Sequence, residues 1–504
     1  MMNRRRLLQS AAVALCPAAC HEKTATPPAA ATPPPPADPA AFASLTELTA
    51  RMQSGKATPT TILQHYLDRI QRIDRTGPKV NAILELNPDA KTIATAAKSG
   101  LLQGLPVLIK DNIETADAMQ TTAGSLALRD HKPKQDAALV TRLREAGAVI
   151  LGKTNLSEWA NIRSPRSTSG WSARGGLTRN PHKLTHTASG SSSGSAAAVA
   201  AGLAPAAIGT ETNGSIISPA SACGIVGFKP TVGRISGAGI IPITHHQDTA
   251  GPMTLTVRDA ALLMQVLSGD FKGDLPADAL KGARLGILRG QSGRHPQVLG
   301  LFEAMLQKLR DAGAVIIDSV ALPNARQIGG LAWKSLLVEL RTDLNAYLEQ
   351  RGGDVRSLSD LINFNQKHRD TEMPHFGQET FEQAEALGAP EVIAAAQEVR
   401  KEATRLAGPE GIDAALKEHK LDALICPTND PAGVIDLAKG DVDVRVLTTP
   451  AAVAGYPHLT VPMGFVDGLP VGFSFIGTAR DDERILALGH AFEQITRARI
   501  SPAL

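Results

Sequence analysis

Residues 189–218 read SGSSSGSAAAVAAGLAPAAIGTETNGSIIS, so that two turns rich in glycine and hydroxyl groups flank an apolar segment. The run Ala196–Ala201 has no polar face and predicts a helix that is buried on all sides. The run Ala204–Ile208 is short, apolar and followed by a glycine, which is typical of a core strand. A turn, a helix, a strand and a second turn would therefore bring Ser191 and Ser215 together, although 24 positions separate them.

This stretch predicts a site rather than a linker. Ser/Gly-rich segments are often flexible linkers, but a linker does not enclose a run as apolar as this one. Glycine allows the backbone to approach a ligand closely or to adopt a positive φ. A serine beside such a turn can present its hydroxyl where several backbone N–H groups converge on one point.

Two further motifs belong with this stretch. They are Gly104-Leu-Pro-Val-Leu-Ile-Lys110-Asp-Asn112 upstream and Gln247-Asp-Thr-Ala-Gly-Pro-Met253 downstream. Together the three resemble the amidase signature family of serine hydrolases over about residues 44–497, and the pattern is most similar to bacterial peptide amidases. The resemblance implies an α/β fold, the amidase signature fold, with a mixed twisted β-sheet flanked by helices on both faces. Short apolar runs that alternate with helical patterns agree with this class.

The residues also predict the chemistry. Amide hydrolysis needs a nucleophile, a base and donors for the oxyanion. Lys110 ends the apolar run Leu105–Lys110, and burial lowers the pKa of a lysine towards the range of a useful base. The resemblance implies that Ser215 is the nucleophile, that Lys110 is the general base, and that Ser191 relays the proton between them. It also implies a cis peptide bond between Gly190 and Ser191.

The second turn is the expected oxyanion site. The resemblance implies that the backbone N–H groups of Thr212, Asn213 and Gly214, with that of Ser215, form the oxyanion hole. Asn213 stands where the family commonly has glycine, so we expect a positive φ there, which asparagine tolerates best among the other residues. We expect no cofactor and no metal.

The residues behind and beside the site give further expectations. Asp111 and Asp248 match motif positions and are expected to be hydrogen-bond partners behind the site. Ile217 and Ser218 occupy positions where relatives that bind carboxylates carry arginine. A neutral or peptide-like amide therefore fits better than a dicarboxylate monoamide or glutamine-dependent amidotransferase work.

The substrate is expected to be a small-molecule or peptide amide, with the C-terminal amide of peptides as the first choice. Small aliphatic or aryl amides are the alternative within the same family. An alternative from another class is an exported binding protein that uses an amidase scaffold without catalysis. Since the net charge is only +3, the composition implies no nucleic-acid partner.

Two motifs are competing interpretations. Gly190-Ser-Ser-Ser-Gly194 matches the nucleophile elbow of Ser-His-Asp hydrolases, with Ser192 as nucleophile, but the preceding residues are polar instead of a buried strand. Gly147-Ala-Val-Ile-Leu-Gly-Lys-Thr154 matches a phosphate-binding loop, but its inner residues themselves read as a strand. The elbow remains the second choice of mechanism, and nucleotide binding is not expected.

The histidines and cysteines leave alternatives open. His182 and His186 have i,i+4 spacing but lack the glutamate of a zinc motif. The pair His245-His246 would either line the substrate pocket or cap a loop. Two of the four cysteines, Cys223 and Cys426, lie outside the N-terminal region, and the sequence does not decide whether they pair.

The N-terminal region predicts export. Residues 1–21 resemble a signal peptide, since three arginines precede the apolar run Leu7–Leu15, and they also resemble a twin-arginine signal. Pro-Ala-Ala-Cys20 loosely matches a lipoprotein cleavage site, at which a lipid would tether the protein to the membrane. Residues 22–43 are rich in proline and alanine and predict a linker. The protein is therefore expected to be exported, either as a periplasmic protein or as a membrane-tethered lipoprotein.

Residues 44–504 are expected to form one catalytic domain, with the oligomeric state left open. Ser44 and Glu47 have the spacing of a helix capping box. Residues 143–150 and 309–316 share a pattern of a helix end, a glycine turn and a buried strand. Residues 325–419 are helical in pattern and are expected to cover the active site.

Overall fold

The computed structural model describes residues 38–97, 99–289, 295–441 and 447–504. The predicted export signal at residues 1–21 lies outside the described residues, as does the predicted linker up to residue 37, so both stay predictions. Within the described part of the chain, no helix combines the length and the apolar character that a membrane span requires.

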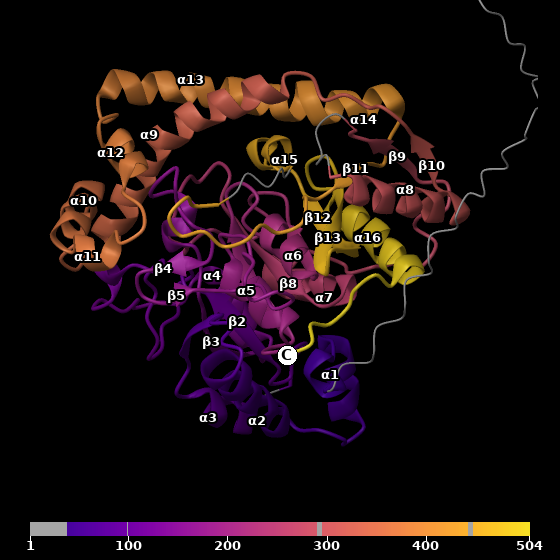
Figure 1. Cartoon of the computed structure of the whole chain (residues 1–504), viewed down its shortest axis with the longest axis horizontal. Helices are drawn as coiled ribbons and strands as arrows, with labels where there is room; N and C mark the ends of the chain where they lie inside the picture. The colour runs from indigo at the N-terminus through magenta and orange to yellow at the C-terminus, as the bar shows by residue number, and fades with distance from the viewer. Residues whose placement is uncertain (1–37, 98, 290–294, 442–446) are drawn as a thin grey trace, which may run out of the picture. The chain divides into compact units, whose positions relative to one another are not determined.

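The described residues build one large mixed β-sheet (Figure 1). Its eleven strands follow the spatial order β1-β3-β2-β6-β8-β7-β12-β13-β11-β9-β10. The strands span Ile83–Leu86 (β1), Pro106–Lys110 (β2), Val149–Thr154 (β3), Ala206–Glu211 (β6), Val226–Lys229 (β7), Thr249–Thr254 (β8), Arg284–Ile287 (β9), Val315–Ile317 (β10), Ala423–Pro427 (β11), His458–Val466 (β12) and Leu469–Ile476 (β13). A small separate hairpin pairs Trp171–Ser172 (β4) with Gly176–Leu177 (β5).

Parallel and antiparallel pairs both occur in the sheet. β3, β2 and β6 are parallel neighbours, and β11, β9 and β10 form a second parallel group. Antiparallel pairs join these groups through β8, β7, β12 and β13. Every residue of β2, β3, β6, β7, β8, β11 and β13 is buried. Strands that are buried throughout need cover on both faces, as the expected fold class requires.

Helices supply that cover. They span Leu45–Gln53 (α1), Pro59–Arg69 (α2), Ala90–Thr95 (α3), Ala138–Glu145 (α4), Ser193–Ala200 (α5), Ile217–Cys223 (α6), Val257–Ser268 (α7), Pro296–Asp311 (α8), Ala325–Arg351 (α9), Leu358–Lys367 (α10), Arg369–Glu372 (α11), Glu379–Glu385 (α12), Pro390–Ala407 (α13), Asp413–His419 (α14), Thr449–Ala454 (α15) and Asp482–Thr496 (α16). Short 3₁₀ or π segments lie at Pro39–Phe42, Ile70–Thr76, Leu126–Leu128, Glu158–Asn161 and Gly408–Ile412.

The predicted central unit is present with shifted bounds, since the helix predicted at residues 196–201 is Ser193–Ala200 and the strand predicted at residues 204–208 is Ala206–Glu211. α5 is buried at every position, as expected of a helix without a polar face. β6 does not stop at Gly209 but continues to Glu211, because Gly209 pairs with Gly251 of β8. A side chain at Gly209 would collide with Ser192, since a Cβ built there lies 2.8 Å from the serine Oγ. The glycine therefore permits a close approach of helix and strand instead of ending the strand.

Other local predictions also meet the structure. Ser44 and Glu47 form the predicted capping box at the start of α1. Residues 143–150 form the expected helix end, glycine turn and buried strand in α4 and β3. At residues 309–316 the prediction of a buried strand is wrong. β10 lies at the edge of the sheet, and its Val315 is exposed.

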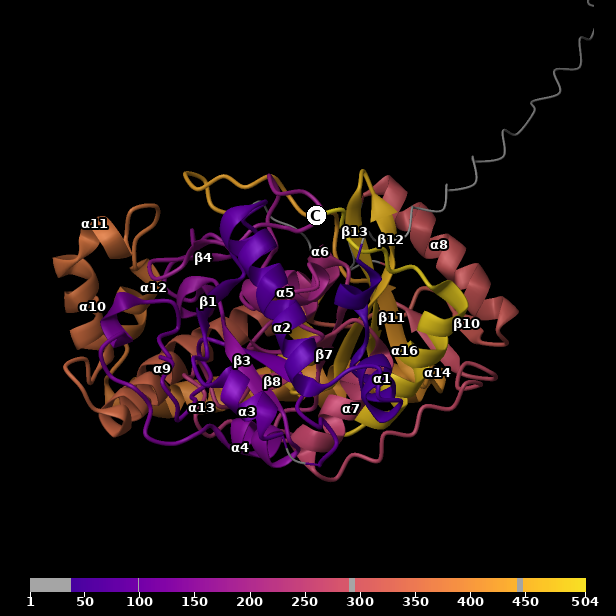
Figure 2. The ribbon, with the colours of Figure 1, turned by 90° about the horizontal axis from the view of Figure 1, so that it is seen from below.

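The start of the described chain is packed rather than extended. Pro39–Phe42 forms a 3₁₀ turn in which Ala41 is fully buried, and the guanidinium of Arg69 lies 5.4 Å from the centre of the Phe42 ring. In Figure 2, α1 and α2 lie in front of the strands. Residues 38–43, which the sequence places in the linker, therefore pack against the body of the protein.

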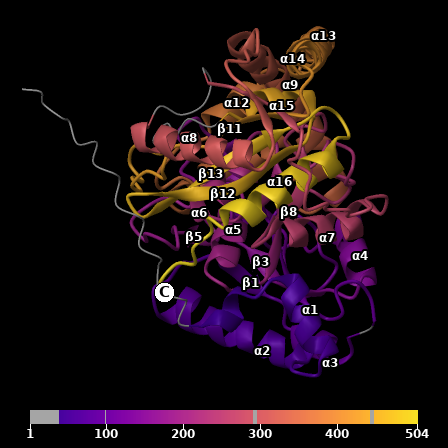
Figure 3. The same cartoon turned by 90° about the vertical axis from the view of Figure 1, so that its right-hand side faces the viewer.

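The segment of residues 325–419 is helical, as predicted. α9 and α13 pack along each other, and both contact α15. In Figure 1 and Figure 3 they lie on the side opposite α2 and α3, with the strands between. This helical layer has its own apolar cluster, which includes Leu340, Leu344 and Phe381.

Two glycines in helices give a matched test of the packing around α5. A Cβ at Gly194 would lie 2.4 Å from the carbonyl oxygens of both Ala82 and Asn155, whereas a Cβ at Gly300 in α8 would meet nothing within 4 Å. We expect Gly194→Ala to lower the free energy of unfolding by about 1–3 kcal/mol or more, because backbone atoms must move. Gly300→Ala should raise it by about 0.5–1 kcal/mol. Urea unfolding of the two variants measures both effects, and equal stability of the two would contradict the expectation.

Candidate active site

Lys110 ends β2 in the interior of the protein. Its side chain is fully buried, and its Nζ lies 2.8 Å from Oγ of Ser191. Nζ also donates to Oγ1 of Thr210 at 2.9 Å and to the carbonyl oxygen of Thr210 at 3.2 Å. The sequence-predicted base and relay are thus in direct contact.

Burial makes this amine a weak base. Removal from water lowers the pKa of Lys110 to about 7, although the negative charges of Glu211 and Asp248 act in the opposite direction. No carboxylate forms an ion pair with its Nζ in the described part of the chain. A substantial fraction of Lys110 is therefore neutral near pH 7 and able to accept a proton.

Ser191 lies where the predicted cis peptide bond occurs. The bond between Gly190 and Ser191 is cis, as the resemblance implied. Ser191 is fully buried, and its carbonyl oxygen accepts from the N–H of Ser157 at 3.0 Å. The next residue links the two glycine-rich turns, because the N–H of Ser192 donates to the carbonyl oxygen of Ser215 at 3.1 Å.

Ser215 is the accessible member of the group. It is 9 % exposed, whereas Lys110 and Ser191 are 0 % exposed, so a substrate can reach Ser215 alone of the three. It lies in the turn between β6 and α6. Glu211 fixes the far side of this turn, since its Oε2 accepts from the N–H groups of Ile216 at 2.7 Å and Ile217 at 3.0 Å.

The same turn has free amide groups. No described residue accepts a hydrogen bond from the backbone N–H of Thr212, Asn213, Gly214 or Ser215. Four such donors in one turn are suited to hold an oxyanion.

The expectation of a positive φ at Asn213 is wrong. The left-handed position is Gly214, with φ of 84°. Because glycine takes that conformation, Asn213 can use its amide to contact the start of α15. Its Oδ1 accepts from Oγ1 of Thr448 at 2.7 Å, and its Nδ2 donates to Oγ1 of Thr449 at 3.1 Å.

Thr212 is held from the downstream motif. Its Oγ1 donates to Oδ1 of Asp248 at 2.5 Å, and its carbonyl oxygen accepts from Nε2 of Gln247 at 3.1 Å. Burial raises the pKa of Asp248 to about 6, and hydrogen bonds from Thr212 and from the N–H groups of Ile243 and Thr244 act in the opposite direction. Asp248 therefore lies behind the site, as predicted.

Asp111 plays a similar part on the other side. Its carboxylate accepts from Oγ1 of Thr122 at 2.5 Å and pairs with Nη1 of Arg174 at 3.0 Å. It is fully buried and makes no contact with Lys110 that would neutralise the amine. Asp111 thus shapes the segment that follows β2, as expected of a partner behind the site.

Two residues of the site were missed in the sequence. Thr210 contacts Lys110 through two oxygens, and Asn112 donates to Oγ1 of Thr210 at 3.0 Å. Both stand in the motifs quoted above. Their role follows from the pairing of β2 with β6, in which Ile109 faces Ile208. Only this pairing brings the end of one motif beside the other.

The competing motifs do not form sites of their own. Ser192 is fully buried, and its Oγ donates to the carbonyl oxygen of Thr210 at 3.0 Å. Lys153, in the motif that matches a phosphate loop, lies inside β3 and donates to the carbonyl oxygen of Ile113. His182 contacts the carbonyl oxygen of Cys223 at 3.1 Å. Within the described residues no group of metal-ligating side chains occurs, and Cys223 and Cys426 are separate buried thiols.

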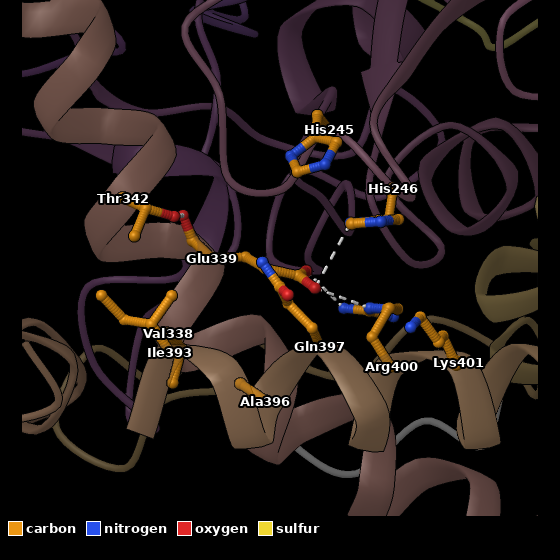
Figure 4. A pocket seen from close by; sticks show the side chains of 10 residues that line it. All are labelled: His245, His246, Val338, Glu339, Thr342, Ile393, Ala396, Gln397, Arg400 and Lys401. Carbon is orange, nitrogen blue, oxygen red and sulfur yellow. Dashed lines mark hydrogen bonds and ion pairs between the residues drawn. The ribbon is translucent and has the colours of Figure 1, made fainter. Parts of the chain in front are cut away.

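His245 and His246 line a cavity of about 320 Å³ between α9 and α13 (Figure 4). His245 also binds Asp343 through its backbone N–H and its Nδ1, both at 2.8 Å. The pair therefore anchors its loop, which is one of the two alternatives left by the sequence, and the other alternative, a lining of the substrate pocket, stays a prediction.

Over most of its length the chain is similar to known amidases. A family model described as Amidase matches residues 61–486. The crystal structure of a peptide amidase from Stenotrophomonas maltophilia is similar, with 46% identity, a TM-score of 0.84, and coverage of 92% of this chain and 99% of that one. A probable amidase of Arabidopsis thaliana is 36% identical over 91% of each chain. A putative amidase of Schizosaccharomyces pombe is 34% identical over 91% of this chain and 86% of that protein.

Proposed function

Because the chain belongs to the amidase family and is an amide-hydrolysing enzyme, we propose that it cleaves carboxamides through an acyl-enzyme on Ser215. Lys110 is the general base, and Ser191 relays the proton. The contact of 2.8 Å between the buried amine and Oγ of Ser191 carries this proposal. The amidase relatives speak against the alternative of a non-catalytic binding protein.

The reaction proceeds in two halves. Oγ of Ser215 attacks the carbonyl carbon while its proton passes to Oγ of Ser191, whose own proton passes to Nζ of Lys110. The N–H groups of residues 212–215 bind the oxyanion. Collapse of this intermediate breaks the C–N bond, and the ammonium of Lys110 returns the proton through Ser191 to the departing nitrogen. Water then attacks the acyl group by the same proton route and regenerates Ser215.

We propose the C-terminal amide of peptides as the substrate. The similarity to a peptide amidase at 46% identity supports this choice. At the two positions where relatives that bind carboxylates carry arginine, this chain has neutral side chains. Ile217 is fully buried, and Oγ of Ser218 bonds to Oγ of Ser189 at 2.8 Å. Neither Ile217 nor Ser218 offers a positive charge to a substrate with a free carboxylate.

Turnover should depend on a neutral Lys110. Since its pKa lies at about 7, kcat/KM should rise with pH through an apparent pKa of about 7 and then level off, because only the deprotonated amine accepts the proton. Lys110→Arg keeps a cation and hydrogen-bond donors but cannot lose its proton, so activity should be lost across the range of about pH 5–10. Release of ammonia from an amide substrate measures both. A flat profile in this range, or an active arginine variant, would contradict the role of Lys110.

Ser215→Ala should abolish both turnover and labelling by a serine-reactive phosphonate, because the variant lacks the nucleophile. Ser192→Ala is the matched control, since Ser192 is the nucleophile of the competing elbow mechanism. It removes two buried hydrogen bonds with the backbone of Thr210 but should keep a labelled Ser215. Labelling that survives in Ser215→Ala and disappears in Ser192→Ala would instead support the elbow mechanism. Mass spectrometry of the labelled peptide distinguishes the two results.

A substrate panel tests the proposed specificity. We expect kcat/KM to be highest for peptides with a C-terminal amide, lower for small aliphatic or aryl amides, and absent for the same peptides with a free acid, which lack the scissile bond. Preference for the small amides would replace the peptide substrate with the alternative, and would leave the mechanism on Ser215 in place.

A further inference from the structure

An ion pair is buried where the helical layer meets the downstream motif. Glu339 of α9 and Arg400 of α13 are 8 % and 2 % exposed, and they form two hydrogen bonds, from Nε to Oε1 at 2.9 Å and from Nη2 to Oε2 at 2.6 Å. Glu339 also accepts from Oγ1 of Thr244 at 2.5 Å and lies 3.3 Å from Nδ1 of His246. Figure 4 shows its carboxylate between His246 and Arg400.

The third nitrogen of the guanidinium, Nη1, bonds outside this ion pair. Nη1 of Arg400 donates to Oε1 of Gln247 at 2.5 Å, and Nε2 of Gln247 donates to the carbonyl oxygen of Thr212 at 3.1 Å. Arginine has only donors, so the oxygen of the Gln247 amide must face it. The NH₂ group must then face Thr212. Arg400 therefore fixes which way the amide of Gln247 points.

The direction of the Gln247 amide affects the turn of residues 212–215, the proposed oxyanion site, through one peptide unit. The carbonyl of Thr212 and the N–H of Asn213 belong to the same planar trans peptide, so they point in opposite directions. A hydrogen bond that holds the carbonyl of Thr212 also sets the direction of the Asn213 N–H. That N–H is one of the four donors of the turn without a described acceptor.

We propose that Glu339, Arg400 and Gln247 are positioning residues that aim the N–H of Asn213 at the oxyanion. This role rests on the proposed function, because it requires an oxyanion beside Ser215. The residues touch no reacting atom. They hold one donor in the direction that the transition state needs, and such preorganised donors act mainly on the transition state.

The geometry explains why an ion pair stands here. Burial alone would raise the pKa of Glu339, but hydrogen bonds from His246, Arg400 and Thr244 lower it to about 2. The carboxylate therefore stays charged over the working pH range and keeps both groups of the guanidinium fork in place. Nη1 is then left for Gln247. A lysine at position 400 has a single ammonium on a flexible stem and cannot reproduce this fork.

The sharpest test changes the Gln247 amide by one atom. Gln247→Glu keeps an oxygen for Arg400 but puts an acceptor opposite the carbonyl of Thr212, so the donor to that carbonyl is lost. We expect kcat for an amidated peptide to fall about 10- to 100-fold, less than the loss of a complete oxyanion donor, with KM changed by less than about threefold. Arg400→Lys should act in the same direction.

The matched control is Gln397→Glu. Gln397 is an exposed residue of α13 that lines the same cavity, and the same amide-to-acid change there should leave kcat unchanged.

Two inhibitors separate positioning from general damage. A peptide aldehyde forms a hemiacetal oxyanion on the serine, so its inhibition constant should rise in Gln247→Glu by about the factor that kcat loses. The free-acid product forms no tetrahedral oxyanion and should lose much less affinity. The ratio of the two constants is measured on active enzyme and does not depend on how much of the variant folds.

An unchanged ratio of the two inhibition constants in Gln247→Glu, whether both inhibitors keep their affinity or lose it equally, would overturn the positioning role. The outcome is independent of the mechanism itself, which fails if Ser215→Ala retains turnover. In the double variant Gln247→Glu/Arg400→Lys, the aldehyde should lose no more affinity than in Gln247→Glu, because both changes act along one path. Additive losses would show that Arg400 acts elsewhere.

Discussion

The contact between the buried amine of Lys110 and the hydroxyl of Ser191 is the interaction on which the site depends. A lysine that is fully shielded from water and without an ion-pair partner is costly to keep charged. The protein meets this cost by lowering the pKa of the amine to about 7 and by giving it three oxygens, one of Ser191 and two of Thr210. An unpaired buried lysine would destabilise an ordinary core, but here its burial supplies a neutral amine that can accept a proton near pH 7.

The sheet explains how residues so far apart in sequence meet. β2 and β6 are parallel neighbours, so the end of β2, with Lys110, lies beside the end of β6, where the oxyanion turn starts. α5 sits against both strands, and Gly209 of β6 allows Ser192, at the start of α5, to approach closely. Ser191 therefore contacts the lysine, and the N–H of the next residue, Ser192, bonds to Ser215 in the turn. A small residue, Gly209, thus sets the distance between the start of α5 and β6, and this distance fixes where the serine hydroxyls lie.

Local sequence patterns predict many of these elements, but they do not predict how the strands pair. The capping box at Ser44, the buried helix α5 and the strand that ends at Lys110 all follow from neighbouring residues, and the structure contains each of them. The spatial order of the strands depends on contacts between distant segments, which no local pattern encodes. For that reason the exposed edge position of β10 and the part played by Thr210 were not visible in the sequence. The sequence likewise predicts a positive φ at Asn213, whereas Gly214 has it and the Asn213 side chain bonds to Thr448 instead. Composition does not say which residue of a turn is left-handed.

The reacting groups and the proposed positioning pair Glu339–Arg400 come from different stretches of the chain. The reacting groups lie within residues 110–215, whereas the helices that face the cavity belong to residues 325–407. An exchange of the later segment for that of a relative would therefore leave the reacting groups themselves unchanged. Arg400 sets a limit on such a chimera, because its bond to Gln247 crosses the junction. A graft that discards this one arginine would leave the Gln247 amide without the donor that sets its direction.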